Sequence, residues 1–337
     1  MSREPVVSVL LPCRDAEAFL PACAATLERQ TFRDFEVVAV DDGSRDGTRR
    51  LLEDWARRDA RVRVLEGEGE GPAGASRRAA EVARGRYLAR MDADDLAHPR
   101  RLELQVSFLE TRSDLAGCGT GVAYVPRSRM GSGYRRYERW LNRVRSPDQL
   151  DRELFVECPV AGPTLMVRAP AYRDAGGYRD AGWPDDYDLV LRLRAAGHRL
   201  ANRPEVLLRW RLHPDNTSRS SDAYSPDAFR RCKVHHLLAG PLPPDREPVV
   251  WGAGSVGKAM ALELRRQGRP PAAFVDLDPR KIGQEIHGAP VWRPDELRSR
   301  EEPYVLVAVG SPGARSEIRE ALASMGRREL VDYRAVA

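Results

Sequence analysis

The chain has 337 residues, a hydrophobic content of 42% and a formal net charge of +5 that comes almost entirely from arginine. The length predicts about two domains. No run approaches the roughly 20 apolar residues that span a bilayer. The N-terminus leads directly into a strand, which predicts a cytoplasmic protein without a signal peptide. Arginines spread over many predicted helices, with acids between them, argue against a nucleic-acid partner, and five cysteines without Cys-x-x-Cys spacing argue against structural zinc and a disulfide framework.

The first half of the chain alternates predicted strands and helices. Apolar runs predict strands at Val6–Leu11, Phe35–Val40, Val62–Leu65 and Tyr87–Met91. The segments between and after them predict helices at Phe19–Gln30, Thr48–Arg57, Gly74–Ala83 and Arg100–Thr111. Such alternation implies a doubly wound α/β sheet with parallel strands and right-handed crossovers.

Two of these strands end in acidic loops. Asp41 and Asp42 follow the second strand, and Asp92, Asp94 and Asp95 follow the fourth. Ligands of open α/β sheets bind at the carboxyl edge of the strands, and carboxylate oxygens suit a hard divalent cation. Adjacent carboxylates repel one another unless a cation or an arginine neutralises them. The pattern therefore favours a nucleotide and metal site over simple helix capping.

The middle of the chain holds two less regular features. The glycine-rich stretch 67–74 precedes a helix, and we expect it near the base or ribose of a nucleotide. The pattern becomes irregular after residue 115, as expected for inserted acceptor-binding segments. Arginines are densest between Arg127 and Arg145. This region predicts contact with anionic lipid or a phosphorylated acceptor, or else a solvated helix face.

A second acidic pair lies farther along the chain. A strand is predicted near Thr164–Val167, and Asp185 and Asp186 then enter a helix predicted at Tyr187–Ala196. Helix capping explains one of these acids but does not require two.

The order of the motifs resembles the family 2 glycosyltransferases of the GT-A fold. The likeness covers roughly residues 5–220. It is carried by Val6–Pro12, Gln30–Glu36, Val40–Ser44, Met91–Asp95, Gly176–Tyr178, Asp185–Leu189 and Trp210–His213. The resemblance implies a mixed α/β sheet and an inverting glycosyltransferase that depends on Mn²⁺ or Mg²⁺. The enzyme would move a sugar from a UDP- or dTDP-linked donor to a hydroxyl of a cell-surface glycan or glycolipid. A place at the inner membrane face, with peripheral contact, is an alternative to free cytoplasmic residence.

The resemblance also implies roles for individual residues. It places donor contacts at Pro12, Asp42, Asp92 and Asp94. It places the metal at Asp94, with Asp92 and Asp95 nearby and His213 approaching the metal or the diphosphate. Asp186 is the implied general base and Asp185 its acidic neighbour. A base must lie within hydrogen-bond reach of the acceptor hydroxyl that it deprotonates.

A linker-like stretch at 239–248 separates predicted domains 1–240 and 241–337. After it, Gly252-x-Gly254-x-x-Gly257 lies between a strand and a helix, and Asp276 ends the next strand, 19 residues after Gly257. This context matches a dinucleotide fingerprint and predicts a small Rossmann-like α/β domain.

The ligand of this predicted domain is open. Residues 274–291 resemble the small nucleotide-binding domains of bacterial sugar-modifying acyltransferases. NAD(P), a nucleotide-sugar, or an assembly role without a ligand are the alternatives. Two rival functions for the whole chain follow: a bifunctional enzyme with NAD-linked sugar chemistry in the C-terminal domain, and a non-catalytic nucleotide-sugar-binding protein.

Overall fold

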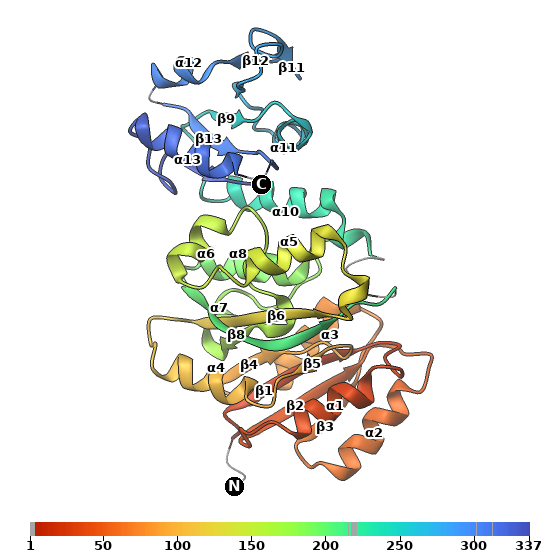
Figure 1. The fold of residues 1–337 in the computed structure, drawn as a ribbon. Helices are drawn as coiled ribbons and strands as arrows, with labels where there is room; N and C mark the ends of the chain where they lie inside the picture. Colours follow the sequence, from red (N-terminus) through yellow and green to blue (C-terminus); the bar gives the residue numbers. More distant parts are fainter. Residues whose placement is uncertain (1–3, 215, 217–220, 301, 312) are drawn as a thin grey trace. The chain divides into compact units, whose positions relative to one another are not determined.

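The computed structural model describes residues 4–214, 216, 221–300, 302–311 and 313–337 (Figure 1). The chain forms two compact units. The first unit comprises Met1–Leu150 and Pro159–Ser221, and the second comprises Asp151–Cys158 and Asp222–Ala337. Among the described residues, none of the helices combines the length and apolarity needed to cross a bilayer.

The first unit is built on a mixed sheet of 8 strands in the order β3-β2-β1-β4-β7-β6-β8-β5. The strands are β1 (Val7–Cys13), β2 (Phe35–Asp41), β3 (Val62–Glu66), β4 (Tyr87–Arg90), β5 (Leu96–Ala97), β6 (Gly117–Val125), β7 (Met166–Arg168) and β8 (Leu200–Arg211). The four neighbouring strands β3, β2, β1 and β4 are parallel to one another. Strand β7 runs antiparallel to β4 and β6, and β6 runs parallel to β8. The predicted α/β mixed sheet is therefore present.

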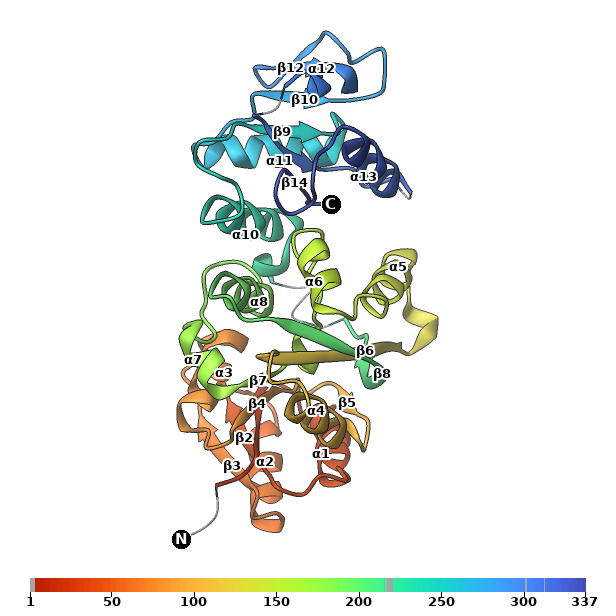
Figure 2. The ribbon, with the colours of Figure 1, turned by 90° about the vertical axis from the view of Figure 1, so that its left-hand side faces the viewer.

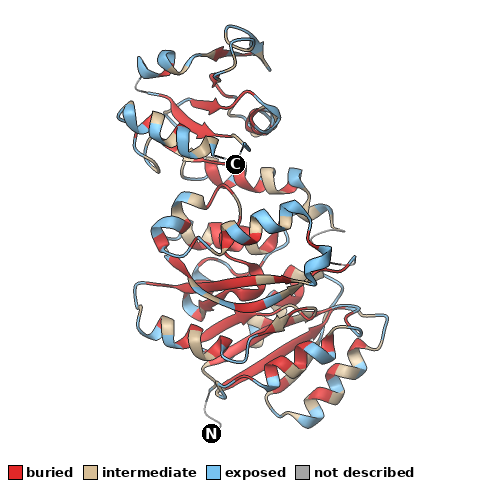
Figure 3. Ribbon diagram, in the orientation of Figure 1, coloured by how far each residue is buried: buried red, intermediate tan, exposed pale blue. Residues whose placement is uncertain are grey.

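Helices cover both faces of this sheet (Figure 2). The helices of this unit are α1 (Leu20–Glu28), α2 (Thr48–Arg58), α3 (Gly71–Val82), α4 (Arg101–Glu110), α5 (Ser132–Leu141), α7 (Ala169–Asp174) and α8 (Asp185–Ala195), with single turns η1 (Arg127–Arg129) and η2 (Gly162–Thr164). Helix α6 (Pro147–Glu153) begins in the first unit, and its last residues belong to the second. Alternate residues of β1, such as Val7, Val9 and Leu11, pack in one cluster with α1, α2 and α4. Because both faces are covered, the central strands β1, β2 and β4 are buried along almost their whole length (Figure 3), which explains their apolar runs.

Two predicted helix starts differ from the structure by two residues or more. Helix α3 begins at Gly71 rather than Gly74, because the glycine-rich loop already turns into the helix. Helix α8 begins at Asp185 rather than Tyr187, with Pro184 at the N-cap position and no side-chain cap. Both acids therefore lie in the first helical turn, where the positive end of the helix dipole stabilises a negative charge.

The second unit holds a smaller sheet of 6 strands in the order β11-β12-β10-β9-β13-β14. They are β9 (Pro248–Trp251), β10 (Ala273–Val275), β11 (Glu285–Ile286), β12 (Ala289–Trp292), β13 (Tyr304–Val307) and β14 (Tyr333–Ala335). All pairs are parallel except β11 with β12. The helices are α10 (Pro226–Leu238), α11 (Ser255–Arg266), α12 (Pro294–Arg298) and α13 (Ala314–Ser324), preceded by the turn η3 (Asp222–Tyr224).

The second unit also contains residues that lie before the predicted boundary at residue 240. Lys233 of α10 is buried, and its Nζ donates to the carbonyl oxygens of Val156 at 2.5 Å and Val336 at 3.3 Å. Arg315 and Arg319 of α13 pair with Glu153 at 2.8 and 2.9 Å. These contacts group α10 and the segment 151–158 with the second unit. The predicted division 1–240 and 241–337 stays a prediction.

Candidate active site

The acidic loop follows β4 at the carboxyl edge of the sheet. The N–H of Met91 donates to the Leu10 carbonyl at 3.0 Å, which extends the pairing with β1, and the N–H of Asp95 donates to the Asp92 carbonyl at 3.1 Å. This turn gathers three carboxylates. One oxygen each of Asp92, Asp94 and Asp95 lies within 4.8 Å of the others.

Asp94 is anchored from a distant part of the chain. Its Oδ2 lies 2.8 Å from His213 Nε2 and accepts a hydrogen bond from Asn216 Nδ2 at 3.1 Å. Asn216 Oδ1 in turn accepts from the His213 N–H at 2.8 Å. The Phe19 ring lies against the imidazole with a centroid separation of 4.2 Å. Both polar contacts use Oδ2, and within the described residues no protein hydrogen bond reaches Oδ1.

Asp95 is the buried member of the loop. Its Oδ1 accepts from the N–H of Arg211 at 2.9 Å, while Oδ2 is buried without a hydrogen-bond partner among the described residues. The Arg211 guanidinium donates to the Asp94 carbonyl and, at 3.0 Å, to the Phe19 carbonyl. Burial, and then the charges of Asp94 and Asp92, raise the pKa of Asp95 well above its ordinary value. Asp95 therefore ties the loop to the end of β8.

The chemistry of this cluster fits a divalent cation. Three carboxylates and an imidazole form a donor set in which oxygen dominates, as Mg²⁺ and Mn²⁺ prefer. The buried Oδ2 of Asp95 has no hydrogen-bond partner among the described residues, and the charges of Asp94 and Asp92 act on the Asp95 carboxyl. A cation at this loop would offset the repulsion among the three carboxylates. Asp94 is the residue best placed to hold it, because its Oδ2 is fixed in orientation by two side chains.

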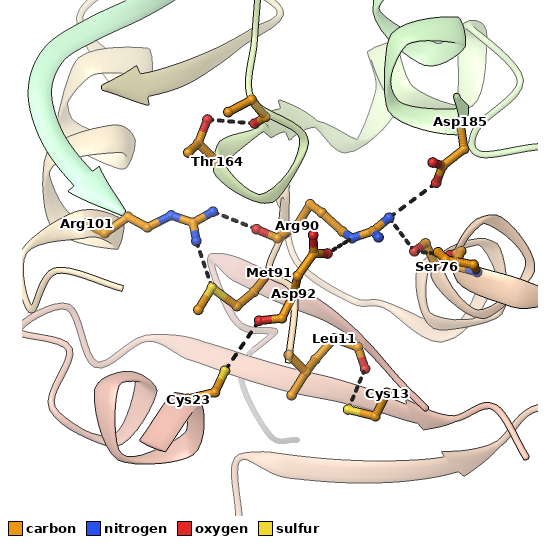
Figure 4. A network of polar contacts seen from close by, with 12 residues as sticks. Leu11, Cys13, Cys23, Ser76, Arg90, Met91, Asp92, Arg101, Thr164 and Asp185 are labelled. Carbon is orange, nitrogen blue, oxygen red and sulfur yellow. Dashed lines mark hydrogen bonds and ion pairs between the residues drawn. The ribbon is translucent and has the colours of Figure 1, made fainter. Parts of the chain in front are cut away.

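Arg90 links the acidic loop to the second acidic pair (Figure 4). It is 7% exposed and lies at the end of β4. Its Nε donates to Asp92 Oδ1 at 2.8 Å, and its Nη1 donates to Ser76 Oγ at 2.7 Å and lies 3.5 Å from Asp185 Oδ2. The guanidinium also lies over the Tyr178 ring, 5.3 Å from the centroid. One buried cation thus fixes the spacing between Asp92 and Asp185.

Asp186 is poised to exchange a proton near neutral pH. Low solvation of its carboxyl, followed by the neighbouring charge of Asp185, raises its pKa to about 7. Its Oδ1 accepts from the Tyr187 N–H at 2.8 Å. A Cβ on residue 162 would lie 2.5 Å from Asp186 Oδ2, so Gly162 of η2 leaves room for this carboxylate. The arrangement suits a general base.

The predicted donor contacts are Pro12, on β1, and Asp42, which directly follows the neighbouring strand β2. Pro12 is opposite Val40 in the register of β1 and β2. Asp42 is buried, and its carboxylate accepts from the N–H groups of Gly69, Glu70 and Gly71 at 2.9, 3.1 and 2.8 Å. Asp42 therefore orders the glycine-rich loop before α3. A direct contact with the donor base stays a prediction for both residues.

Comparison with known proteins places this arrangement in a family. The model of the family described as "Glycosyl transferase family 2" matches residues 8–175. EpsE of Bacillus subtilis (strain 168), whose name assigns it to the glycosyltransferases, is 32% identical over 246 residues, which cover 69% of this chain and 85% of EpsE. The chain belongs to glycosyl transferase family 2.

Solved structures support the fold of this glycosyltransferase. S. aureus TarS (residues 1–349) in complex with UDP-GlcNAc superposes with a TM-score of 0.58 at 17% identity, covering 77% of this chain and 72% of that one. The mannosyltransferase PcManGT from Pyrobaculum calidifontis, in complex with GDP-Man and Mn²⁺, gives a TM-score of 0.51 at 20% identity, covering 70% and 63%. At these identities the likeness establishes the glycosyltransferase fold alone.

The glycine turn of the second unit is largely explained by packing. A Cβ at Gly252 (φ +121°) would lie 2.7 Å from the Ala308 carbonyl oxygen, and one at Gly257 would lie 1.7 Å from the Gly252 carbonyl oxygen. A Cβ at Gly254 would have no heavy atom within 4 Å among the described residues. Gly254 is therefore the position where the local packing does not demand glycine.

Asp276 is also used by the chain itself. Its Oδ2 accepts from the Ala253 N–H at 2.8 Å and from Lys281 Nζ at 3.0 Å, and its Oδ1 accepts from the Asp278 N–H at 2.9 Å. The structure brings Asp276 to the glycine turn, as the spacing predicts. Its carboxylate supports the turn, and binding of a ribose stays a prediction.

Two residues of the candidate site escape the sequence analysis. Arg90 carries a detectable signal, because a charge inside the apolar run Tyr87–Met91 requires a buried partner. Asn216 carries none, since a single asparagine in an irregular loop after β8 has no periodicity or spacing to mark it. Both contact acids that the sequence does identify.

Proposed function

We propose that this glycosyltransferase is an inverting, divalent-metal-dependent enzyme. It transfers a sugar from a UDP- or dTDP-linked donor to a hydroxyl of a glycan or glycolipid. The observation that carries the proposal is the Arg90 bridge between Asp92 and Asp185. The bridge joins an oxygen-rich cluster suited to a metal and a diphosphate with the acid pair that contains a candidate base.

The acidic loop serves the leaving group. Asp94, oriented by His213 and Asn216, would hold Mn²⁺ or Mg²⁺ together with Asp92. A bound divalent cation supplies Lewis-acid stabilisation of the negative charge on the departing diphosphate. The titles of the TarS and PcManGT structures, which name UDP-GlcNAc in one case and GDP-Man with Mn²⁺ in the other, support this general chemistry.

Asp186 serves the nucleophile. The acceptor oxygen forms a bond to the anomeric carbon as its proton passes to the Asp186 carboxylate, and the bond from that carbon to the diphosphate oxygen breaks. Attack opposite the leaving group inverts the anomeric configuration. A pKa of about 7 leaves a substantial fraction of Asp186 ionised at neutral pH, as a general base requires.

The second unit is proposed to be a Rossmann-like domain. Its parallel strands β12-β10-β9-β13-β14, counted along the chain, stand in the order 3-2-1-4-5, and the glycine turn follows the central strand β9. This order favours a nucleotide ligand at the turn. NAD-linked sugar chemistry in this unit has weaker support, because the Asp276 carboxylate is already bonded to Ala253, Asp278 and Lys281.

Thermal-shift screening tests the donor class. UDP-, dTDP- and GDP-sugars, NAD⁺ and NADP⁺ are each added to the full chain with and without Mn²⁺, because a ligand that binds only the folded state raises Tm. We expect stabilisation by UDP- or dTDP-sugars that requires Mn²⁺. Stabilisation by NAD⁺ alone would favour the bifunctional alternative. Binding of a donor without turnover on any acceptor would favour the non-catalytic one.

A further inference from the structure

One stretch of the first unit concentrates positive charge on the surface. The basic segment, defined here as residues 127–145, contains seven arginines and a single acid, Glu138. All seven arginines are exposed, whereas Glu138 is buried. The arginines are Arg127, Arg129, Arg135, Arg136, Arg139, Arg143 and Arg145.

The single acid does not neutralise this charge. The Glu138 carboxylate accepts from the N–H of Tyr124 at 2.8 Å and pairs with Arg127 at 2.7 Å. None of the other six arginines forms an ion pair with an acid of the described chain. Arg129 and Arg139, for example, use one nitrogen each to reach the backbone carbonyls of Leu212 at 3.3 Å and Arg135 at 3.2 Å. Since a guanidinium has five N–H donors, most of their binding capacity is left over.

Arginines elsewhere in the first unit are treated differently. Many of those on the helices and loops around the parallel strands pair with nearby acids: Arg57 with Asp54, Arg77 with Glu70, Arg84 with Glu36, Arg86 with Glu110 and Arg100 with Glu103. The exposed arginines of this region that lack an acid partner among the described residues are spread along the chain at Arg14, Arg29, Arg33, Arg45 and Arg58. Even a hollow of about 530 Å³ lined by Arg84, Arg86, Arg168 and Arg173 is compensated in this way at two of its four arginines. The basic segment therefore differs in that it gathers six such arginines in one short stretch of the chain.

Helix α5 presents these charges on one side. Its inner side carries Tyr134, Tyr137 and Leu141, which pack against the sheet and the Tyr124, Met130 and Leu212 cluster. Arg135, Arg136 and Arg139 recur at three- and four-residue spacing on the other side, which is the spacing of one helix face, and Arg143 follows in the turn after the helix. These four arginines are distributed along the helix and the turn that follows it. A partner with many separated negative charges fits this pattern better than a single phosphate.

The basic segment is fixed beside the transfer site. The Tyr124 ring stacks on Trp210 of β8 at 5.1 Å, and Arg129 donates to the carbonyl of Leu212. The next residue, His213, contacts Asp94. Whatever binds the basic segment is therefore held close to the strand end that carries the proposed metal site.

We propose that the basic segment is the face through which this glycosyltransferase docks on an anionic lipid leaflet. Phospholipid headgroups supply the dense array of phosphates that spread arginines can meet one by one. Docking would bring a lipid-borne acceptor to the site, and only this consequence depends on the proposed function. The attraction is electrostatic, so it should weaken as salt shortens the screening length.

Vesicle co-sedimentation tests the docking face independently of catalysis. The full chain is mixed with vesicles of phosphatidylcholine, or of phosphatidylcholine with phosphatidylglycerol, at low and high salt. The test variant is Arg136→Gln/Arg139→Gln/Arg143→Gln. The matched control, Arg57→Gln/Arg77→Gln/Arg100→Gln, removes three exposed arginines that are paired with acids. Unchanged thermal melting checks the fold of both variants.

We expect the wild type to bind only the phosphatidylglycerol vesicles, and to lose that binding in high salt. Each arginine contributes about fivefold to binding, so the test variant should bind about 100-fold more weakly. The control should bind like the wild type, and turnover with a water-soluble acceptor should be the same in all three proteins. Equal binding by the two variants, or absent binding by the wild type, overturns the proposal. Binding to soluble polyphosphate but not to vesicles would assign the face to a phosphorylated acceptor instead.

Discussion

The acidic loop of the first unit and the glycine turn of the second each follow a parallel strand at the carboxyl edge of a sheet, yet the carboxylates at the two places are used in opposite ways. Asp94 is held by His213 and Asn216, which lie 119 and 122 residues away along the chain. The Asp276 carboxylate accepts hydrogen bonds from Ala253, Lys281 and Asp278. These three residues and Asp276 itself belong to the glycine turn and the loop after β10.

The difference separates a site from a structural support. In the second unit, local amides and a lysine satisfy the carboxylate, so little of its charge is left for a ligand. In the first unit, distant side chains orient Asp94 through one oxygen, and the neighbouring Asp95 keeps a buried oxygen without a partner among the described residues. An acid at the end of a strand is therefore weak evidence by itself. Convergence of groups from several segments is stronger evidence.

The largest effect is expected at Asp94. Asp94→Asn removes the oriented anionic oxygen while keeping size and hydrogen bonds, and kcat should fall by about 10²–10³-fold, the range seen when a preorganised charge-stabilising group is lost. The loop is part-exposed, so thermal melting should change little. Steady-state kinetics with saturating Mn²⁺ measure the effect. The matched control is Asp114→Asn, an exposed acid paired with Arg112, which should behave as wild type. Near-wild-type turnover in Asp94→Asn would show that Asp94, like Asp276, is a structural support and not part of a site.

A loss of about 10²-fold is expected for Asp186→Asn, as is usual for a missing general base. In the wild type, kcat should rise as the pH passes through about 7, because the carboxyl must be ionised to accept the proton. The variant should lack this rise. A pH–rate profile measured with a genuine acceptor tests both statements, and a profile that persists in Asp186→Asn would point to another base.

The Asp186 carboxyl makes stability fall with rising pH, whereas it makes kcat rise. Its pKa in the folded protein is raised from the ordinary 3.8 to about 7, so the protonated form favours folding. This contribution is fully present below about pH 4 and is lost as the pH rises through 7. Wild type and Asp186→Asn should therefore differ in their change of Tm between acid and neutral pH, with the wild type losing more. If Tm changed with pH by the same amount in wild type and in Asp186→Asn, this linkage would be contradicted.

A smaller effect, about tenfold in kcat, is expected when the Arg90 bridge is cut, since it orients acids and touches no substrate. In Arg90→Met, loss of the positive charge near the acid pair should also move the pH–rate midpoint upward. Arg90→Lys restores the charge but not the two-sided hydrogen bonding, so it should recover the midpoint while recovering kcat only in part. Comparison of the three pH–rate profiles makes the test. An unshifted midpoint in Arg90→Met would reduce the residue to a packing role.

The smallest effect on transfer is expected in the glycine turn. Gly254→Val meets no heavy atom of the described chain at its Cβ, so folding should be preserved, whereas Gly257→Ala collides with the Gly252 carbonyl and should cost about 1–3 kcal/mol of stability. If the turn binds a nucleotide, Gly254→Val should lose that binding and keep transfer. The full chain is needed, because a fragment starting after α10 would lose Lys233 and Glu153. Unchanged nucleotide binding in Gly254→Val would leave the turn a structural feature.

Much of this architecture is visible in the sequence because its signals are local. Apolar runs locate β1 to β4, and acid or glycine clusters after strands locate both loops. The partners of those clusters are not visible, since Asn216 and Lys281 reach them only in the folded chain. The segment 151–158 is likewise assigned to the second unit by long-range contacts with α10 and α13 that leave no local pattern. Asp276 is the clearest case: its spacing from the glycine turn is predicted correctly, but the spacing does not reveal that the chain's own groups already bond its carboxylate.

The central claim, that Asp94 and its distant partners form a metal-dependent donor site, is tested most directly by calorimetry. UDP and dTDP are titrated into the full wild-type chain with Mn²⁺ or with EDTA, and into Asp94→Asn with Mn²⁺. We predict that at least one nucleotide binds the wild type with Mn²⁺, and that this binding is lost both in EDTA and in Asp94→Asn. Equal affinity in Mn²⁺ and EDTA, or full affinity in Asp94→Asn, would contradict the claim.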